Sequence, residues 1–409
     1  MKSKTTEFLK NIGYSFLSFA LPTIVLQLII QPAIANKIGA ELNGQYLTLM
    51  SFNFFLIGIT ASVLNTVRLL QNGKYETYRY KGDFNGIYLF YVIFLLLTMP
   101  IAMLYYTKKI VFIDLVLYLA IGQLYLYHDY IFVQYRLKLE YNKILISNIL
   151  MVLGYVVGLL LFFHFLKWQL VFISAYIFSF VYDYSQTDFI REPVCKTPLF
   201  NDTIKLLVML TISSILGSAL TYFDKLLLYP MLGGSSVSIY NTASLIGKVL
   251  LLISAPMSSV FLSYLVQEDT IINRFRLKHY LSLVIFLILV YAICVIAGFP
   301  LTDYLYPNWS KESQQLIPIT VAASLFFLLS NCINTVLIRF FKTYLQIILQ
   351  GIHLAFYLGL SLIGLRFYGL LGFCVGVAAS NLVRLLLVII TLRLKPKKYL
   401  IIEEGLQNE

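Results

Sequence analysis

Residues 84–105 of the chain read FNGIYLFYVIFLLLTMPIAMLY, a run of 22 residues without a charged side chain. A helix needs roughly 20 mainly apolar residues to cross the hydrocarbon core of a bilayer, which is about 30 Å thick. Runs of similar length and hydropathy recur along the whole chain. We place twelve of them, at 9–33, 44–70, 84–105, 110–134, 144–166, 168–186, 204–228, 238–266, 280–302, 316–338, 344–365 and 369–392. The sequence therefore predicts an all-α integral membrane protein with twelve transmembrane helices.

The composition of the 409-residue chain agrees with this assignment. Apolar residues make up 59% of the chain and charged residues only 12%, and the mean hydropathy is +0.82. A soluble domain usually holds about 25% charged residues, so an ordinary soluble enzyme, a disordered chain and a secreted disulfide scaffold are excluded. The four cysteines make no C-x-x-C pair and the four histidines have no H-x-x-x-H spacing. We therefore expect neither a metal site nor a cofactor.

The basic residues are distributed unevenly between the two ends of the predicted helices. With the N-terminus in the cytoplasm, 21 of the 31 Lys and Arg residues fall on the cytoplasmic side, 6 fall in the outer connections and 4 fall inside the helices. This bias follows the positive-inside rule for short loops. We therefore expect a multi-pass membrane protein with both termini in the cytoplasm. The same bias explains the net charge of +12 without a nucleic-acid partner.

Two similar connections indicate an internal repeat. Residues 38–46 read IGAELNGQY and residues 232–240 read LGGSSVSIY, so each has a glycine seven residues before a tyrosine, at an offset of 194 residues. We interpret this as two six-helix lobes around a central cleft, as in alternating-access carriers. The lobes are predicted to cover residues 1–203 and 204–409, the second with a short cytoplasmic tail. In each connection we expect the glycine to end one helix and the tyrosine to anchor the next at the membrane interface.

Several stretches resemble a known family. Residues 223–233 (FDKLLLYPMLG), followed by 238–243 (SIYNTA), are similar to the junction between the seventh and eighth helices of bacterial polysaccharide flippases. The connection 136–143 (RLKLEYNK) and the segments 368–372 (YGLLG) and 380–384 (SNLVR) also resemble this family. These flippases belong to the multidrug/oligosaccharidyl-lipid/polysaccharide exporter superfamily. The twelve predicted helices fit the polysaccharide branch of this superfamily. They do not fit the lipid II flippase branch, whose proteins look like fourteen-helix proteins.

The resemblance implies a carrier that moves an undecaprenyl-diphosphate-linked oligosaccharide repeat unit to the outer leaflet, for the synthesis of O-antigen, capsule or exopolysaccharide. It implies partners in the membrane lipid and in the polymerase and glycosyltransferases of the same pathway. Such a carrier needs cations for the phosphates and hydrogen-bonding groups for the sugar inside a wet cleft. Ionisable residues within the predicted helices are costly to bury, so they are the first candidates.

Lys248 and Arg384 are the main candidates for a cationic cleft. Lys248 lies about 15 Å from the outer surface at a rise of 1.5 Å per residue, and Asn241 and Ser244 share its helix face. Arg384 lies about 12 Å above the inner surface, with Asn381 one turn before it. The alternative for Lys248 is a structural, buried ion pair. Opposite Arg384 a face of small residues suits close helix contact: Gly369, Gly372, Gly376 and Ala379.

Two further cations lie near predicted helix ends. Arg68 is either a substrate-binding cation or, more simply, an interfacial anchor. Lys225 either binds substrate or snorkels to the outer surface, and its neighbour Asp224 need not pair with it because adjacent helical residues point apart. This position is often Arg in the resembled family, and Lys puts a bidentate phosphate contact in doubt. A polar stripe on the same helix either lines the cleft or packs against another helix: Thr211, Ser214, Ser218 and Thr221.

Asp129, Asp224 and His353 are the candidates for ion coupling or charge balance. Asp129 either carries a coupling ion or neutralises a cation such as Arg384. His353 lies near the middle of a predicted helix, where a hydrogen-bonded core histidine is more common than a proton relay. Asp183 lies near a helix end and is expected at the membrane interface.

Two other function classes compete with the flippase. A cation-coupled exporter of drugs or organic cations would favour buried carboxylates, whereas the deep candidates here are mainly basic. A membrane polysaccharide polymerase would carry a large outer loop with catalytic residues, and the longest outer connection, 303–315, is short. We find no Ser-His-Asp arrangement, carboxylate pair or metal constellation in the sequence, so we expect a transporter without catalytic residues.

Overall fold

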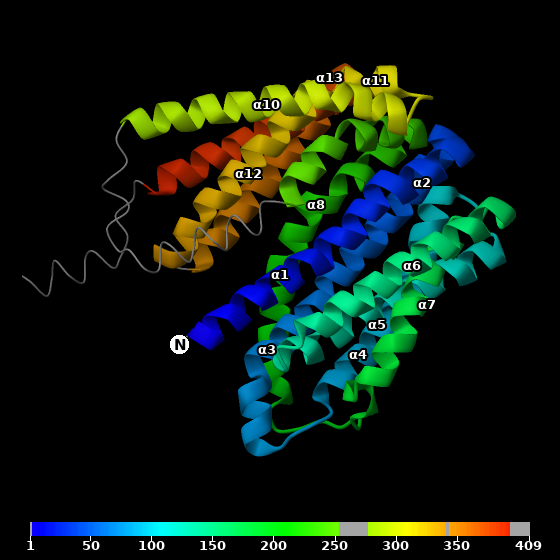
Figure 1. Cartoon of the computed structure of the whole chain (residues 1–409), viewed down its shortest axis with the longest axis vertical. Helices are drawn as coiled ribbons and strands as arrows, with labels where there is room; N and C mark the ends of the chain where they lie inside the picture. The colour runs from blue at the N-terminus through cyan, green and yellow to red at the C-terminus, as the bar shows by residue number, and fades with distance from the viewer. Residues whose placement is uncertain (1, 253–276, 341–342, 393–409) are drawn as a thin grey trace, which may run out of the picture. The chain divides into compact units, whose positions relative to one another are not determined.

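The computed structural model describes residues 2–252, 277–340 and 343–392, and all the regular elements among them are helices (Figure 1). This agrees with the predicted all-α class. The end of the predicted helix 238–266 and the cytoplasmic tail 393–409 lie outside the described residues. The elements are α1 (Lys2–Val25), η1 (Leu26–Ile30), α2 (Gln31–Ile59), α3 (Ala61–Tyr78), α4 (Asp83–Thr107), α5 (Phe112–Leu137), α6 (Tyr141–Phe165), α7 (Gln169–Gln186), η2 (Phe189–Arg191), α8 (Phe200–Ala243), α10 (Leu277–Leu305), α11 (Ser310–Gln314), α12 (Ile317–Phe340) and α13 (Thr343–Leu392).

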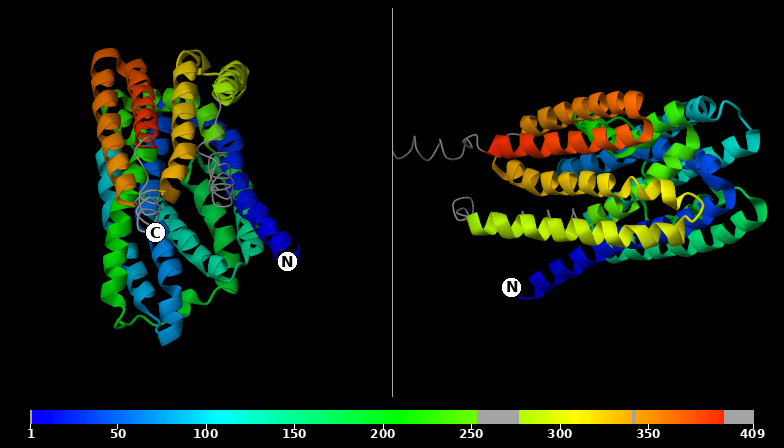
Figure 2. Two further views of the ribbon diagram at one scale, coloured as in Figure 1. Left: turned by 90° about the vertical axis from the view of Figure 1, so that its left-hand side faces the viewer. Right: turned by 90° about the horizontal axis from the view of Figure 1, so that it is seen from above.

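The chain divides into two compact units, Met1–Val237 and Ser238–Glu409. Within the first unit, α6 packs against α1 and α7, and α5 packs against α3, α4 and α7. Within the second unit, α12 lies along α13, and α10 lies along α12 (Figure 2). This division falls inside α8, whereas the sequence places the boundary of the lobes after residue 203. The lobe boundary and the central cleft stay predictions.

Seven described stretches are long and apolar enough to cross a membrane: Gly13–Tyr78, Asp83–Thr107, Tyr141–Phe165, Phe200–Ala243, Ile285–Leu305, Ile317–Thr335 and Leu345–Leu392. Three of them are 66, 44 and 48 residues long, more than twice the roughly 20 residues that one crossing needs. Each of the three contains a non-helical glycine that redirects the chain. The chain is therefore a multi-pass membrane protein, and the count of twelve crossings stays a prediction.

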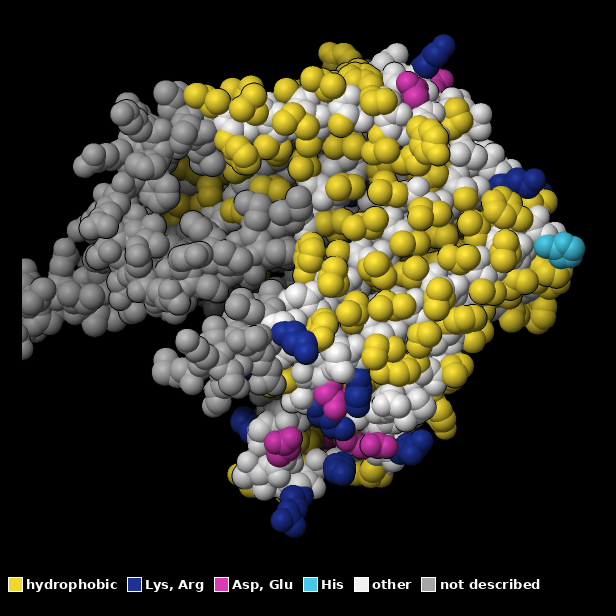
Figure 3. Space-filling model, viewed as in Figure 1, with side chains coloured by type: hydrophobic (Ala, Val, Ile, Leu, Met, Phe, Trp, Pro, Cys, Tyr) yellow, Lys and Arg dark blue, Asp and Glu magenta, His cyan; other side chains and the backbone are white. Residues whose placement is uncertain are grey.

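The surface of the described helices has the composition that a lipid environment requires. Figure 3 shows apolar side chains over most of the visible described surface, while Lys, Arg, Asp and Glu side chains gather towards the helix ends. Large apolar side chains are exposed along whole helices, for example Phe90, Leu97 and Ile101 on α4, at 62%, 64% and 67%. In water, apolar faces of this length would be expensive to expose. Against hydrocarbon they are the favourable arrangement.

The two connections of the predicted repeat have the same backbone conformation. Gly39 in α2 has φ 82° and ψ 169°, and Gly233 in α8 has φ 80° and ψ 177°. Positive φ is readily accessible only to glycine, so each glycine interrupts its helix as expected. The tyrosines behave differently from the prediction. Tyr46 and Tyr240 are 1% and 7% exposed, since they pack against Phe172 and Phe373, respectively, and they are not interfacial anchors.

Glu41 fastens these two connections to each other within the first unit. Its carboxylate accepts hydrogen bonds from the backbone N–H groups of Gly234 (3.0 Å) and Ser235 (2.8 Å) and from the Ser235 hydroxyl (3.1 Å). The helix restarts after Gly233, so these N–H groups would otherwise lack partners and carry partial positive charge. Gly44 lies so close to the Gly234 backbone that a Cβ atom on Gly44 would overlap it. This role of Glu41 was not predicted from the sequence.

In the second unit, α13 turns back on itself at Gly369, which has φ 58°. The two arms of α13 then approach each other closely. A Cβ atom on Gly372 would overlap the Gly364 carbonyl, and one on Gly376 would overlap the Leu360 carbonyl. The predicted close helix contact is confirmed for these two glycines. This contact positions the arm that carries Arg384.

Candidate functional site

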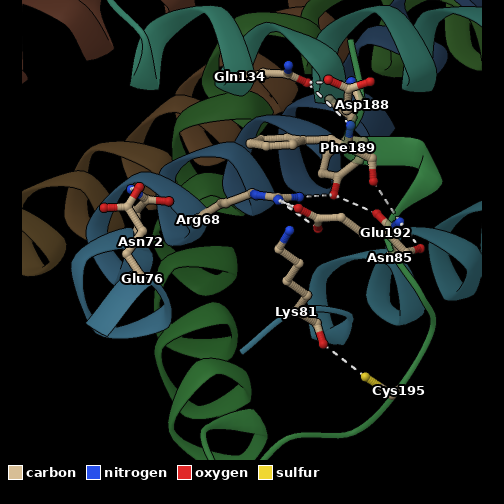
Figure 4. A network of polar contacts seen from close by, with 11 residues as sticks. Arg68, Asn72, Glu76, Lys81, Asn85, Gln134, Asp188, Phe189, Glu192 and Cys195 are labelled. Carbon is tan, nitrogen blue, oxygen red and sulfur yellow. Dashed lines mark hydrogen bonds and ion pairs between the residues drawn. The ribbon is translucent and has the colours of Figure 1, made fainter. Parts of the chain in front are cut away.

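Arg68, on α3, has a full set of partners within the first unit. Its guanidinium donates to both oxygens of Glu192 at 2.7 and 2.8 Å and to the Tyr130 hydroxyl at 2.6 Å, and it lies 3.4 Å from the ring centroid of Phe189 (Figure 4). Asn85 holds the same segment by donating to the carbonyls of Phe189 and Glu192. The Arg68 side chain is only 6% exposed, so it is not an exposed interfacial anchor. Because Glu192 neutralises its charge, the geometry lends no support to a substrate contact.

The segment between α7 and α8 is fastened at further points that the sequence analysis missed. The Gln134 side-chain oxygen accepts the backbone N–H groups of Asp188 and Phe189 at 3.1 and 3.3 Å (Figure 4). The buried carboxylate of Asp83 accepts the Thr197 N–H at 2.8 Å and the Tyr75 hydroxyl at 2.6 Å. Arg68 is therefore one member of a structural network that docks this segment onto α3, α4 and α5.

Lys225 and Asp224 form an ion pair, a contact that the sequence leaves open because neighbours on a helix point apart. The Lys225 Nζ lies 3.1 Å from each carboxylate oxygen of Asp224, and the backbone N–H of Lys225 also donates to that carboxylate. The two side chains are 9% and 10% exposed. The long lysine side chain curls back and does not snorkel. Its charge is thus neutralised within the unit.

The polar stripe of α8 divides into two kinds of contact. The Ser214 hydroxyl donates to the Gly58 carbonyl of α2 at 2.7 Å, and the Ser218 hydroxyl lies against Gly58 as well. Thr211 and Thr221 instead donate to carbonyls of their own helix. For Ser214 and Ser218 the geometry favours the helix-packing alternative.

Asp129, on α5, keeps one carboxylate oxygen without a hydrogen-bond partner among the described residues, although this atom is buried. Tyr125 lies one turn before it and stacks on Tyr176 with ring centroids 5.1 Å apart. The carboxylate also lies within electrostatic reach of Tyr222. Asn65 holds the backbone carbonyl of Asp129 in place. The result is an acidic group in an aromatic environment.

A second acidic group of the first unit is fully satisfied. Asp183 is 0% exposed and accepts hydrogen bonds from Ser147 (2.9 Å), Ser179 (2.8 Å) and Tyr135 (3.0 Å). His128 completes the cluster, with its Nδ1 2.6 Å from the Ser179 hydroxyl. Asp183 is therefore buried in the protein and not exposed at the interface. The partners lie on three helices, and their spacing in the sequence gives no signal of the cluster.

In the second unit, Lys248 and Asn241 contact each other, as their shared helix face predicts. The Lys248 Nζ donates to the Asn241 side-chain oxygen. The Ser244 hydroxyl donates to the Asn241 backbone carbonyl at 3.0 Å. The Lys248 ammonium thus has a hydrogen-bonded partner on its own helix, and the choice between a cleft cation and a buried ion pair stays open.

Arg384, on the second arm of α13, is 9% exposed. Its Nη2 donates to the Asn331 side-chain oxygen at 2.8 Å, and its guanidinium lies 4.5 Å from the ring centroid of Phe327. Its Nη1 is buried and has no hydrogen-bond partner among the described residues. Phe327 and Asn331 were not predicted as partners of Arg384, although a spacing of four residues places them on one face of α12.

His353 and Asn381 adjoin this cation. The Nε2 of His353 lies 3.1 Å from the Asn381 side-chain oxygen, and Asn381 Nδ2 donates to the Ala323 carbonyl at 2.9 Å. His353 is 1% exposed, and its ring lies 6.4 Å from that of Phe327. His353, Asn381 and Arg384 are thus brought together by α12 and both arms of α13.

Comparison with known proteins gives a match in fold. No family model and no curated protein matches the sequence. The lipid II flippase MurJ in an inward closed conformation aligns with a TM-score of 0.70 at 15% identity, covering 95% of this chain and 88% of that one. An inward-facing multidrug resistance transporter of the MATE family, in the MOP superfamily, gives a TM-score of 0.61 at 14% identity, covering 92% and 96%. The Vibrio cholerae MATE transporter VcmN in its bent form gives 0.57 at 16% identity, covering 95% and 97%.

These similarities show that the chain has the fold of this group of membrane transporters. The predicted class, an all-α integral membrane protein, is confirmed. The identities lie far below the level at which a shared cargo follows from a shared fold. The cargo therefore has to be argued from the side chains.

Proposed function

We propose that the protein is a flippase that translocates undecaprenyl-diphosphate-linked oligosaccharide repeat units across the bacterial cytoplasmic membrane by alternating access. Its partners would be this lipid-linked oligosaccharide, membrane lipid, and the polymerase and glycosyltransferases of a surface polysaccharide pathway. Both termini would lie in the cytoplasm. Fold similarity to MurJ and to MATE transporters supports transport, and the resemblance to polysaccharide flippases in sequence supports the cargo.

One observation carries the choice of an anionic cargo, namely that Arg384 has no ion-pair partner among the described residues. The described part of the second unit holds only two carboxylates, Asp303 and Glu312, and neither pairs with Arg384. A buried charge without a counter-ion is strongly destabilising. Such a cation contributes favourable electrostatic energy only when an anion binds next to it. The diphosphate of a lipid-linked sugar is an anion of this kind.

The substitutions Lys248→Ala and Arg384→Ala test this proposal. Each should strongly reduce display of surface polysaccharide in cells that depend on this protein, while the amount of protein in the membrane stays the same. The matched control is Arg366→Gln, which removes a cation from an exposed position of the same helix and should leave display intact. Normal display in both alanine variants would contradict the cationic site.

A second candidate function rests on Asp129. One of its buried carboxylate oxygens has no hydrogen-bond partner that the structure describes. Beside stacked tyrosines, this is an environment that suits an organic cation. This would agree with a cation-coupled drug exporter on the same fold. In that case Asp129→Asn should abolish resistance to cationic drugs in a sensitive strain, while Arg384→Ala should have little effect. The opposite pattern favours the flippase.

A further inference from the structure

The orientation of the Asn381 amide determines which ring nitrogen of His353 carries a hydrogen. The Ala323 carbonyl can only accept a hydrogen bond, so the amide group that faces it at 2.9 Å must be the NH2 group of Asn381. The Asn381 oxygen therefore faces His353, and the nitrogen 3.1 Å away, Nε2, must carry a hydrogen. In a neutral imidazole the other nitrogen is then a bare acceptor.

That bare acceptor is His353 Nδ1, which has no hydrogen-bond partner in the described part of the chain. The atom is buried and makes no hydrogen bond among the described residues, in a side chain that is 1% exposed. Buried polar atoms nearly always have hydrogen-bond partners, and leaving a buried acceptor without a hydrogen bond costs free energy. His353 thus presents an unused acceptor whose position Asn381 fixes.

An unused donor lies beside the same aromatic ring. Arg384 Nη1 is buried and finds no hydrogen-bond partner within residues 2–252, 277–340 and 343–392. The guanidinium and the His353 imidazole both adjoin Phe327, at 4.5 and 6.4 Å from its ring centroid. A simple anion would satisfy Arg384 but would turn only acceptor atoms towards Nδ1. A ligand that satisfies both atoms must combine a negatively charged group with a nearby hydrogen-bond donor.

We propose that Arg384 and His353 form a subsite for a glycosyl phosphate, in which Arg384 Nη1 donates to a phosphate oxygen and His353 Nδ1 accepts a hydrogen bond from a sugar hydroxyl. This proposal rests on the proposed function and adds to it, because it assigns the recognition of the sugar next to the phosphate to a neutral histidine. Asn381 is a positioning residue that keeps Nδ1 free of hydrogen.

Two substitutions of His353 separate recognition from a purely structural role. His353→Gln places an amide near the position of Nε2, where it can still donate to Asn381, and leaves no acceptor at Nδ1. His353→Asn places an amide oxygen near Nδ1 and loses the contact with Asn381. A structural histidine predicts that the Gln variant behaves like the wild type and that the Asn variant is impaired. The glycosyl phosphate subsite predicts the reverse.

Binding of α-D-glucose 1-phosphate and of methyl phosphate to the full chain in lipid nanodiscs is measured by calorimetry at pH 8. At this pH both probes are mostly dianions, because the second phosphate pKa is about 6. The wild type should prefer the sugar phosphate about tenfold, in the range of one hydrogen bond. His353→Gln should lose this preference and keep its affinity for methyl phosphate, and Arg384→Gln should bind neither. An unchanged preference in His353→Gln would overturn the subsite.

Glycosyl phosphates occur in lipid-linked and in soluble forms, and a second pair of probes distinguishes them. Farnesyl-diphospho-N-acetylglucosamine should bind more tightly than UDP-N-acetylglucosamine, and His353→Gln should weaken binding of both. Tighter binding of the soluble compound, with the same loss in His353→Gln, would support the subsite and contradict the proposed flippase. Normal wild-type discrimination that persists in His353→Gln would overturn the subsite and leave the flippase standing.

Discussion

The two units of the chain differ in how buried cations are partnered, as Arg68 and Lys225 show in the first unit and Arg384 shows in the second. In the first unit Arg68 pairs with Glu192, and Lys225 pairs with Asp224. In the second unit Arg384 contacts only an amide oxygen and an aromatic ring, and one of its nitrogens has no partner among the described residues. A neutralised buried charge stabilises the fold, whereas an unneutralised one costs stability and needs a ligand to offset it. The difference supports structural roles for Arg68 and Lys225 and the cargo-binding role that we propose for Arg384.

The largest effect is expected at Arg68. Arg68→Ala removes one partner of a buried pair, leaves the Glu192 carboxylate uncompensated, and should destabilise the first unit by about 3–5 kcal/mol. A marked fall in the melting temperature in nanodiscs and in the amount of protein in the membrane would follow. If Arg68→Ala were as stable as the wild type, the assignment of Arg68 to a structural network would be wrong.

A smaller effect is expected at the ion pair of α8. Asp224→Asn leaves Lys225 charged and buried and should cost about 1–3 kcal/mol. The double variant Asp224→Asn with Lys225→Met removes the charge as well and should recover most of that loss. Thermal melts of both single variants and the double variant give the coupling free energy between the residues. A coupling near zero would show that the pair does not stabilise the unit.

The smallest effect is expected at Ser214. Ser214→Ala removes the hydrogen bond to the Gly58 carbonyl and should lower stability by about 1 kcal/mol. Polysaccharide display should stay normal, because this hydroxyl packs two helices together. A stable protein with defective display would instead place Ser214 in the cargo path and weaken the division between structural and cargo-binding polar groups.

The fold class could be predicted from the sequence because the bilayer imposes a simple rule on hydropathy and length. The helix interruptions at Gly39 and Gly233 could also be predicted, since positive φ restricts the residue type. The packing of Tyr46 and Tyr240 could not be predicted, because hydropathy does not tell whether an aromatic side chain faces the interface or a neighbouring helix.

The roles of the buried charges were harder to predict because their partners lie far away in sequence. Glu192 is 124 residues from Arg68, and Asn331 is 53 residues from Arg384. Depth within a predicted helix singled out Arg384 correctly as a buried cation, but it could not show whether a counter-ion was present. The pairing of Asp224 with Lys225 was left open for a different reason. The rule that neighbours point apart describes Cβ directions and does not include the length of a lysine side chain.

The most direct test of the account is the melting temperature of wild type and Arg384→Gln in nanodiscs with farnesyl diphosphate added. A ligand present at about 100 times its Kd stabilises the native state by about 2.7 kcal/mol. We predict that the anion raises the melting temperature of the wild type and leaves that of Arg384→Gln unchanged. An equal rise in both proteins, or none in the wild type, would contradict the claim that Arg384 is a cation kept for an anionic cargo.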